Sequence, residues 1–278
     1  MRPYSRVYAT VNLDAVASNM KSMRENLPAS TLIMGSVKAD GYGHGSVPIA
    51  KTIEPYVFGY AVATIDEGII LRRHGINKTI LILGVTHESQ YEELLRYDIR
   101  TAMFQYEKAK KLSDLAVKHG KKAVVHLALD TGMSRIGMKA DREHAKEAAS
   151  IAALEGIEVE GLFTHFARAD ETDKSAYEEQ YRRYKEFLGY LEELGVQIPI
   201  RHCSNSAGIV ESLESNHMDM VRAGIAIYGM YPSDEVDHNS VKLTPAMEIK
   251  SCITYIKEIG AGTAVSYGGT FVADHTMK

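Results

Sequence analysis

The segment Thr31-Leu-Ile-Met-Gly-Ser-Val37 runs directly into Lys38-Ala-Asp-Gly-Tyr-Gly-His-Gly45. The first part is an apolar run typical of a buried strand, and the glycines of the second are typical of a loop. Short apolar runs alternate with longer amphipathic segments along the rest of the chain, which indicates βαβ units and a parallel sheet. The predicted strands are Thr31–Val37, Tyr56–Ala63, Thr79–Leu83, Ile99–Phe104, Ala123–Leu129, Val159–Thr164, Ile198–His202 and Met218–Arg222.

Helices are expected between these strands, and several end in the glycine that is usual just past a last helical turn. Eight strand–helix repeats favour closure into a (β/α)8 barrel. The alternative is an open doubly wound sheet, but no GxGxxG motif follows the first strand to support it. The helices that end in this way are Ile65–His74 before Gly75, Tyr106–His119 before Gly120, and Tyr177–Leu194 before Gly195.

A change in the pattern of predicted helices and strands along the sequence indicates two domains. Residues 14–240 carry the barrel pattern, and residues 241–278 have a β-only pattern. Residues 1–13 contain an alternating strand that we expect to join the β part. These boundaries leave only two or three strands in the C-terminal part, which is marginal for an independent domain. We therefore expect that the chain is truncated or pairs with another chain.

Elements at the two ends are predicted as follows. Arg6–Leu13 reads as a strand, and a helix from about Asp14 to Asn26 follows it, with Asp14 as the N-cap. Near the C-terminus, Ala246–Glu258 and Thr270–Ala273 read as strands around a glycine-rich turn.

Composition limits the class of protein. The 278 residues are 45% hydrophobic and 24% charged, with a formal net charge of -4, so there is no electrostatic case for nucleic acid or an anionic membrane. No signal peptide is recognisable, and no apolar run reaches the roughly 18 residues of a membrane span. Cys203 and Cys252 lack a metal-like spacing, and we expect both to be reduced. The predicted location is the cytoplasm.

Polar residues cluster just after the predicted strands. In a barrel the active site lies at the C-terminal ends of the strands, so these side chains should face one another. A lysine that is desolvated in such a cleft becomes a Schiff-base nucleophile. The residues in question are Lys38, Arg135, His165, Asn205 with Ser206, and Arg222 with Gly224.

The segment Val37–Gly45 closely resembles the pyridoxal phosphate (PLP) lysine motif of the alanine racemases. The further motifs match in the same order and span nearly the whole chain. They are Asp130–Gly137, Thr164–Ala167 with Ala169-Asp170, Asn205–Ser206, Arg222–Gly229 and Val265–Thr270.

The resemblance implies that Lys38 holds PLP as a Schiff base and that the enzyme racemises L- and D-alanine, supplying D-alanine for peptidoglycan. Racemisation needs a base on each face of the substrate Cα. Lys38 would be one base, and Tyr267, supplied by the partner subunit of a homodimer, the other. Arg222 would donate to the pyridine nitrogen. Because an arginine keeps its proton, the ring becomes a weaker electron sink, which favours reprotonation of Cα over transamination.

The remaining roles follow from the same resemblance. The phosphate would be bound by Tyr42, Ser206 and the backbone amides of Gly224 and Ile225. Arg135 would pair with the substrate carboxylate or lie beside the phenolic oxygen of the cofactor. The other expected contacts are His165 and Leu83 at the ring, Asn205 at the cofactor, and His202 behind Arg222; no metal is implied.

Two departures from the family pattern stand out. Many members carry a carbamylated lysine where this sequence has Ala128, so we expect chloride, water or another carboxylate to neutralise Arg135. The family's β domain also continues beyond residue 278. We therefore expect the 278-residue chain to bind PLP but to be a weak racemase.

Three alternatives stay open at this point. The substrate could be serine or a broader set of amino acids, because a small pocket distinguishes them weakly in sequence. The chain could be a non-catalytic PLP-binding barrel protein, although such proteins lack an equivalent of the segment around Tyr267. It could also be a Schiff-base aldolase without PLP.

Overall fold

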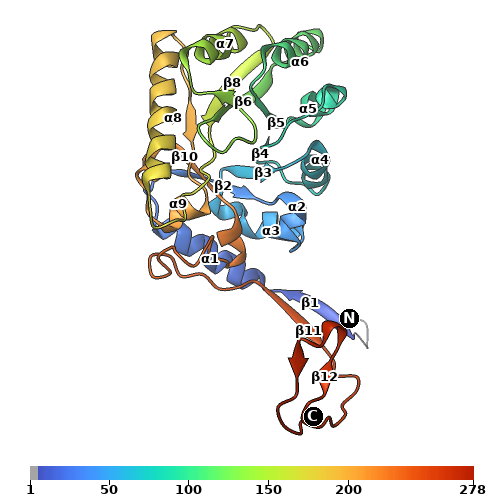
Figure 1. The fold of residues 1–278 in the computed structure, drawn as a ribbon. Helices are drawn as coiled ribbons and strands as arrows, with labels where there is room; N and C mark the ends of the chain where they lie inside the picture. The colour runs from blue at the N-terminus through green and yellow to red at the C-terminus, as the bar shows by residue number, and fades with distance from the viewer. Residues whose placement is uncertain (1–5) are drawn as a thin grey trace. The chain divides into compact units, whose positions relative to one another are not determined.

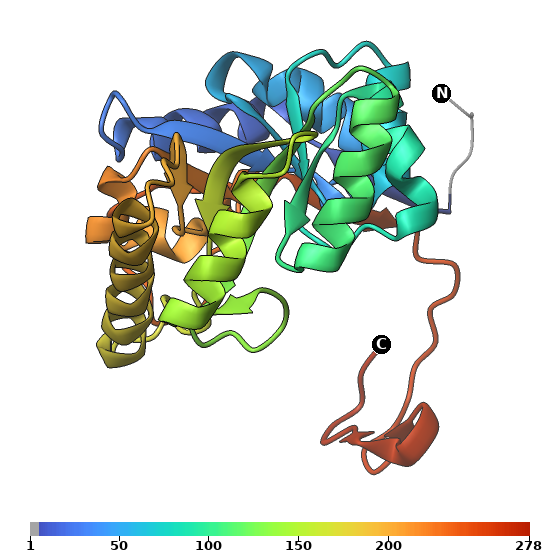
Figure 2. The same cartoon turned by 90° about the horizontal axis from the view of Figure 1, so that it is seen from above.

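The computed structural model describes residues 6–278, which form two units (Figures 1 and 2). The barrel unit comprises residues 12–246. The β unit combines the N-terminal strand, up to Val11, with residues 247–278.

The barrel unit is built on eight parallel strands within the described residues. Their order is β10-β2-β3-β4-β5-β6-β8-β9. Because the last strand of the barrel pairs with the first, the sheet curls back on itself, and the predicted (β/α)8 barrel is confirmed (Figure 1). The strands are β2 (Leu32–Ser36), β3 (Gly59–Val62), β4 (Thr79–Ile82), β5 (Arg100–Met103), β6 (Ala123–Asp130), β8 (Ile157–Phe163), β9 (Ile200–His202) and β10 (Met220–Ala223), and the short β7 (Met138–Lys139) pairs with the end of β6.

The seam between β9 and β10 closes without a regular ladder. The Arg222 N–H donates to the Ser204 carbonyl at 2.9 Å, just past the end of β9. At the other end of the seam, the Asp219 carboxylate accepts from the Arg201 N–H at 2.8 Å. Single hydrogen bonds therefore join these two strands where their neighbours are joined by ladders.

Helices follow the strands and lie around the outside of the sheet (Figures 1 and 2). The capping box of Thr64 and Glu67 starts α4, since each side chain accepts from the backbone of the other. The helices are α1 (Leu13–Glu25), α2 (Lys38–Tyr42), α3 (Ser46–Ile53), α4 (Ile65–Arg73), α5 (Tyr91–Tyr97), α6 (Tyr106–Lys118), α7 (Arg142–Ala152), α8 (Ser175–Glu193) and α9 (Ser206–Val210).

Several predicted bounds in the barrel unit differ from the structure, and two of the differences have a clear local cause. The N-cap of α1 is Asn12, not Asp14, because the helix begins at Leu13 and the Asn12 side chain accepts from the Ala15 N–H at 3.1 Å. The predicted strand Tyr56–Ala63 starts too early. Glu54–Tyr56 forms a 3-10 turn with a proline inside it, and the strand begins at Gly59.

The barrel interior is filled by side chains from successive strands. One cluster contains Met34, Ala61, Leu81 and Met220, and a second contains Ala102, Ala128 and Phe163. Leu83 packs against both clusters. The interior is therefore a packed core, as expected for this fold, and a ligand must bind above it.

Asn19 ties α1 to the segment that follows the barrel strands. Its side chain is fully buried, and its amide donates to the carbonyls of Ile227 at 3.1 Å and Thr244 at 2.9 Å. Its carbonyl oxygen accepts from the Thr244 N–H at 2.7 Å.

We expect Asn19→Leu to lower the free energy of unfolding by roughly 2–4 kcal/mol, because it leaves buried backbone groups without partners. Urea unfolding followed by circular dichroism measures this. Ser18→Ala, at the exposed neighbouring position, is the control. An equal effect of the two substitutions would contradict the tether.

The β unit contains two small antiparallel pairs. β1 (Val7–Val11) pairs with β11 (Met247–Ser251), and β12 (Ala264–Val265) pairs with β13 (Phe271–Val272). The predicted strand Ala246–Glu258 is therefore too long, because its partner β1 has only five residues to pair with. None of the helices in residues 6–278 combines enough length with enough apolar character to span a bilayer.

Candidate active site

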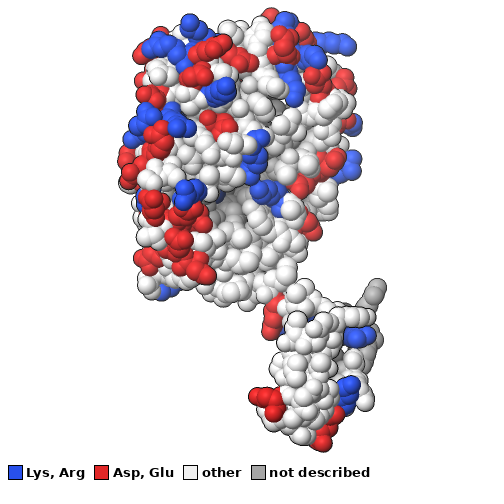
Figure 3. Space-filling model, viewed as in Figure 1, with Lys and Arg blue, Asp and Glu red and all other residues white. Residues whose placement is uncertain are grey.

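Two cavities lie at the C-terminal ends of the barrel strands. Their volumes are about 210 and about 240 Å3. Lys38, Leu83, His165 and Arg222 line both, so the two cavities adjoin. In Figure 3 positive and negative side chains mix over the face of the barrel unit, and a hollow flanked by basic side chains is visible on it.

Nearly all residues predicted from the sequence meet at these cavities. Arg135 joins the four shared residues in the first cavity. Tyr42, Asn205, Ser206, Gly224 and Ile225 join them in the second. Only Tyr267 belongs to the β unit, where its side chain is fully exposed, and its place at the site stays a prediction.

Lys38 opens a turn with an unusual backbone. After it, Ala39, Asp40 and Tyr42 have positive φ angles of 52°, 51° and 52°. Such left-handed angles are costly for residues with a Cβ and persist only where surrounding contacts hold them. The sequence predicted a glycine-rich loop here; the structure shows one left-handed turn instead.

Glu67 at the start of α4 supplies some of these contacts. One carboxylate oxygen accepts from the Ala39 N–H at 2.7 Å, and the other from the Ala63 N–H at 2.6 Å. The Asp40 carboxylate accepts from the Ser46 N–H at 2.8 Å. These hydrogen bonds fix the backbone after Lys38, and β2 fixes the backbone before it, so the position of Lys38 at the end of the strand is well defined.

The environment of Lys38 favours its neutral amine. Burial lowers the pKa of Lys38, and the positive charge of Arg135 lowers it further, while Glu67 opposes the shift. A lower pKa means that more free amine, the nucleophilic form, is present at a given pH.

We expect the cofactor-free chain to react with an amine-specific reagent at Lys38 with a midpoint below the ordinary lysine pKa of about 10.4. Arg135→Gln removes a positive charge and should move this midpoint upward. Peptide mass spectrometry after timed labelling reads the rate at each pH, with the exposed Lys51 as internal reference. A midpoint that stays in place in Arg135→Gln would contradict the electrostatic cause.

Arg222 is buried at the centre of the site. One terminal nitrogen donates to the His202 carbonyl and to His202 Nδ1, both at 3.0 Å. The other donates to the Thr164 carbonyl at 2.7 Å and the Cys203 carbonyl at 3.1 Å. Among residues 6–278, no acceptor is found for the Nε–H. Arg222 lines both cavities.

Arg222 is charged, whereas the two histidines nearest to it, His165 and His202, are neutral. Burial lowers the pKa of Arg222 to about 10, so the guanidinium still keeps its proton near neutral pH. Burial and then Arg222 hold the pKa of His165 at about 3, and the same two causes hold the pKa of His202 well below its usual value. Both histidines are therefore neutral. The expected contact of His202 with Arg222 is confirmed.

Backbone amides and hydroxyl groups, which can donate hydrogen bonds, also line the second cavity. The Ser206 hydroxyl accepts from the amides of Gly224 at 2.9 Å and Ala226 at 3.3 Å. Ile225 is the first residue of a 3-10 helix, which cannot satisfy its amide. Gly224 allows close approach here, because a Cβ on it would come within 3.3 Å of the Tyr42 hydroxyl.

Other predicted contacts have structural duties as well. Asn205 caps α9, since its carbonyl oxygen accepts from the Gly208 N–H at 3.1 Å. Leu83 lines the cavities but also packs on the core. Ala128 is buried in the core, and within the described part of the chain no carboxylate pairs with Arg135. The carboxylate alternative for neutralising Arg135 therefore finds no candidate in residues 6–278.

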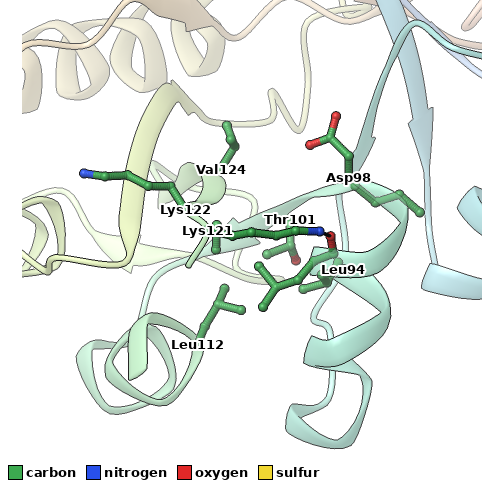
Figure 4. A pocket seen from close by; sticks show the side chains of 10 residues that line it. Leu94, Asp98, Thr101, Leu112, Lys121, Lys122 and Val124 are labelled. Atoms are coloured by element: carbon green, nitrogen blue, oxygen red, sulfur yellow. Dashed lines mark hydrogen bonds between the residues drawn. The ribbon is translucent and has the colours of Figure 1, made fainter. Parts of the chain in front are cut away.

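Another cavity, of about 280 Å3, lies at the N-terminal ends of β5 and β6 (Figure 4). Lys121 crosses it and donates to the Leu95 carbonyl at 2.8 Å. No residue predicted for the site lines this cavity. The C-terminal end of the barrel is the better candidate for chemistry.

The chain is similar to proteins of known family and structure. The family model for the alanine racemase N-terminal domain matches residues 11–232. An alanine racemase of Desulforamulus reducens is 43% identical over 266 residues, or 95% of this chain and 72% of that relative. The solved alanine racemase of Clostridium difficile 630 gives a TM-score of 0.90 at 39% identity, covering 99% of this chain and 72% of that one. The alanine racemase of Bacillus anthracis, solved with bound L-Ala-P, gives 0.87 at 32% identity over 99% of this chain and 71% of that one. The chain therefore belongs to the alanine racemase family.

Proposed function

We propose that this chain interconverts L- and D-alanine with PLP attached to Lys38. Family membership supports the reaction and its substrate. The observation that carries the cofactor assignment is the pairing, in one cavity, of Lys38 with a buried arginine whose Nε–H finds no acceptor among residues 6–278. A heterocyclic nitrogen in the cavity would accept a hydrogen bond from that donor.

The residues present fit the group in two further respects. The Ile225 amide, the Ser206 hydroxyl and the Tyr42 hydroxyl form a set of donors suited to a phosphate. The apolar side chains of Leu83 and Phe163 offer surfaces beside an aromatic ring. When bound, PLP supplies an electron sink that makes the Cα–H of an attached amino acid acidic.

The roles of the protein side chains follow from the need for a base on each face of Cα. The Lys38 Nζ takes or returns the proton on one face, and its lowered pKa makes the neutral amine, the basic form, more available. We propose that the Tyr267 hydroxyl does the same on the other face. Arg135 would hold the substrate carboxylate, which fixes the orientation of Cα between the two bases.

Arg222 would limit the side reaction. Because the guanidinium keeps its proton, the ring nitrogen receives a hydrogen bond and not a full charge. The sink is then weak, and proton return to Cα is favoured over loss of the amino group to the cofactor.

The assembly and location belong to the same proposal. We propose a homodimer in which Tyr267 of one subunit completes the site of the other, with PLP bound by the barrel unit of each. The exposed Ile253 and Tyr255 of the β unit are apolar surface that a partner could cover. The exposed, unpaired Cys252 fits a reducing compartment such as the cytoplasm. The D-alanine formed would serve peptidoglycan synthesis.

Two measurements on the purified protein test the proposal. PLP added to the chain should produce the visible absorbance of lysine-bound cofactor, and borohydride should fix it on Lys38, as read by peptide mass spectrometry. L-Alanine should then convert to D-alanine, with L-serine as the competing substrate. Absence of the absorbance, or attachment at another lysine, would refute the assignment of Lys38.

A further inference from the structure

A series of hydrogen-bonded side chains, which we call the histidine relay, connects Arg222 through His202 and His126 to Glu160. Arg222 contacts His202 Nδ1 at 3.0 Å, and His202 Nε2 lies 2.8 Å from His126 Nδ1. His126 Nε2 lies 2.9 Å from the Glu160 carboxylate. Both histidines are fully buried. Neither His126 nor Glu160 lines the cavities of the candidate active site.

Donor and acceptor can be assigned for each of the three hydrogen bonds of the histidine relay. Arg222 is only a donor, so His202 Nδ1 must accept, and the neutral ring then carries its proton on Nε2. His202 therefore donates to His126 Nδ1, which leaves the His126 proton on Nε2, facing Glu160. All three hydrogen bonds point from the arginine toward the carboxylate, an arrangement in which each strengthens the next.

The carboxylate at the end of the histidine relay is charged. Burial opposes ionisation of Glu160, but the hydrogen bond from His126 and the charge of Arg100, 3.4 Å away, outweigh it and lower the pKa of Glu160. Burial lowers the pKa of His126, and its Nδ1 must be unprotonated to accept from His202, so this ring is neutral beside its acidic partner. One negative charge is thus linked to one buried positive charge through two neutral rings.

A β-bulge and a glycine in the backbone of β8 accommodate the histidine relay. The pairing of β6 with β8 shifts register at His126: Val125 pairs with Val159, but His126 pairs with Gly161, so Glu160 is the extra residue of a bulge. Bulges are rare between parallel strands and re-aim a side chain. Gly161 leaves room for the ring, since a Cβ there would lie 2.5 Å from His126 Nδ1.

We propose that Glu160 and His126 are positioning residues that act through His202 to keep Arg222 a charged, weakly acidic donor. The consequence for the ring nitrogen rests on the function proposed above. Without the distant charge, Arg222 becomes more acidic and donates more strongly to that nitrogen. The cofactor then becomes a stronger sink, and more turnovers end with the amino group of alanine on the cofactor and release of pyruvate.

The hydrogen-bond pattern is tested without cofactor. Imidazole 15N shifts of the cofactor-free wild-type chain should show His126 and His202 as neutral rings protonated on Nε2, unchanged from about pH 5 to 8, where an ordinary histidine titrates. A His202 protonated on Nδ1, or titration of either ring in this range, would overturn the proposal. This arm needs no variant, so a folding defect cannot obscure it.

The functional consequence is tested with Glu160→Gln, which keeps an acceptor but removes the charge. The His126 Nε2–H resonance should move upfield. The ratio of pyruvate formed to alanine racemised should rise on the order of tenfold, as expected for loss of one coupled partner. Glu158→Gln, an exposed position on the same strand, is the control.

The outcomes separate this proposal from the proposed function. If both the resonance and the ratio in Glu160→Gln match wild type, the positioning role is refuted although PLP binding stands. If wild type binds no PLP but shows the expected imidazole pattern, the cofactor assignment fails and the histidine relay stands as a feature of the barrel alone.

Discussion

Replacing Lys38 by alanine is expected to abolish the visible absorbance of the PLP-treated protein and to lower racemisation at least about a thousandfold. Both effects have one origin, because the same Nζ would hold the cofactor and move a proton at Cα. Ser206 and the Ile225 amide, which we propose bind the phosphate, are not altered by this change. We therefore expect PLP still to bind, but reversibly and without the lysine bond.

Equilibrium dialysis distinguishes loss of the bond from loss of binding. Lys51→Ala, on the exposed face of α3, is the matched control and should behave as wild type. Added methylamine should restore part of the activity of Lys38→Ala, because a small amine can occupy the space of the missing side chain. A variant that keeps the absorbance would show that another lysine carries the cofactor.

Replacing Tyr267 by phenylalanine is expected to lower the rate of racemisation by about a hundred- to ten-thousand-fold, the usual contribution of a general base. The absorbance of bound PLP should be unchanged, since Lys38 is intact. Exchange of the Cα hydrogen with solvent deuterium should persist for one enantiomer and stop for the other. NMR of each enantiomer in heavy water reads both. Equal loss of exchange from the two would contradict a role on one face only.

The two variants together test whether the site is shared between subunits. Lys38→Ala and Tyr267→Phe chains should each have the strongly reduced activity given above, but in the proposed homodimer a hybrid would have one site with both wild-type residues. Equal mixing after dissociation should restore about a quarter of wild-type activity, because half of the dimers are hybrids with one working site of two. No recovery, with hybrid dimers demonstrated by native mass spectrometry, would place both residues in one subunit.

Much of the barrel follows from local sequence. The apolar runs Ala123–Leu129 and Thr79–Leu83 are recognisable because buried parallel strands carry few polar residues. The start of β3 was misplaced because Tyr56 looks like a strand residue, whereas the preceding proline favours a turn. The N-cap of α1 was misplaced because Asn12 and Asp14 are equally good capping residues, and only the first helical turn decides between them.

The candidate site was predictable where chemistry and strand ends coincide, as at Lys38, His165 and Arg222. The left-handed turn was not, because Ala39 and Tyr42 have no local preference for positive φ and are held there by distant groups. Glu160 was missed for a related reason. A single residue of bulge decides which way its side chain points, and a strict two-residue period cannot reveal it.

The seam between β9 and β10 has a consequence for breathing motions of the barrel. Regions joined by few backbone hydrogen bonds open at lower free energy than laddered strands, so this is where amide exchange should begin. Ser206 follows one side of the seam, and Arg222 and Gly224 belong to the other. A ligand that contacts all three residues would bridge β9 and β10 at this weakly paired seam. Its binding would raise the free energy needed to open the barrel there.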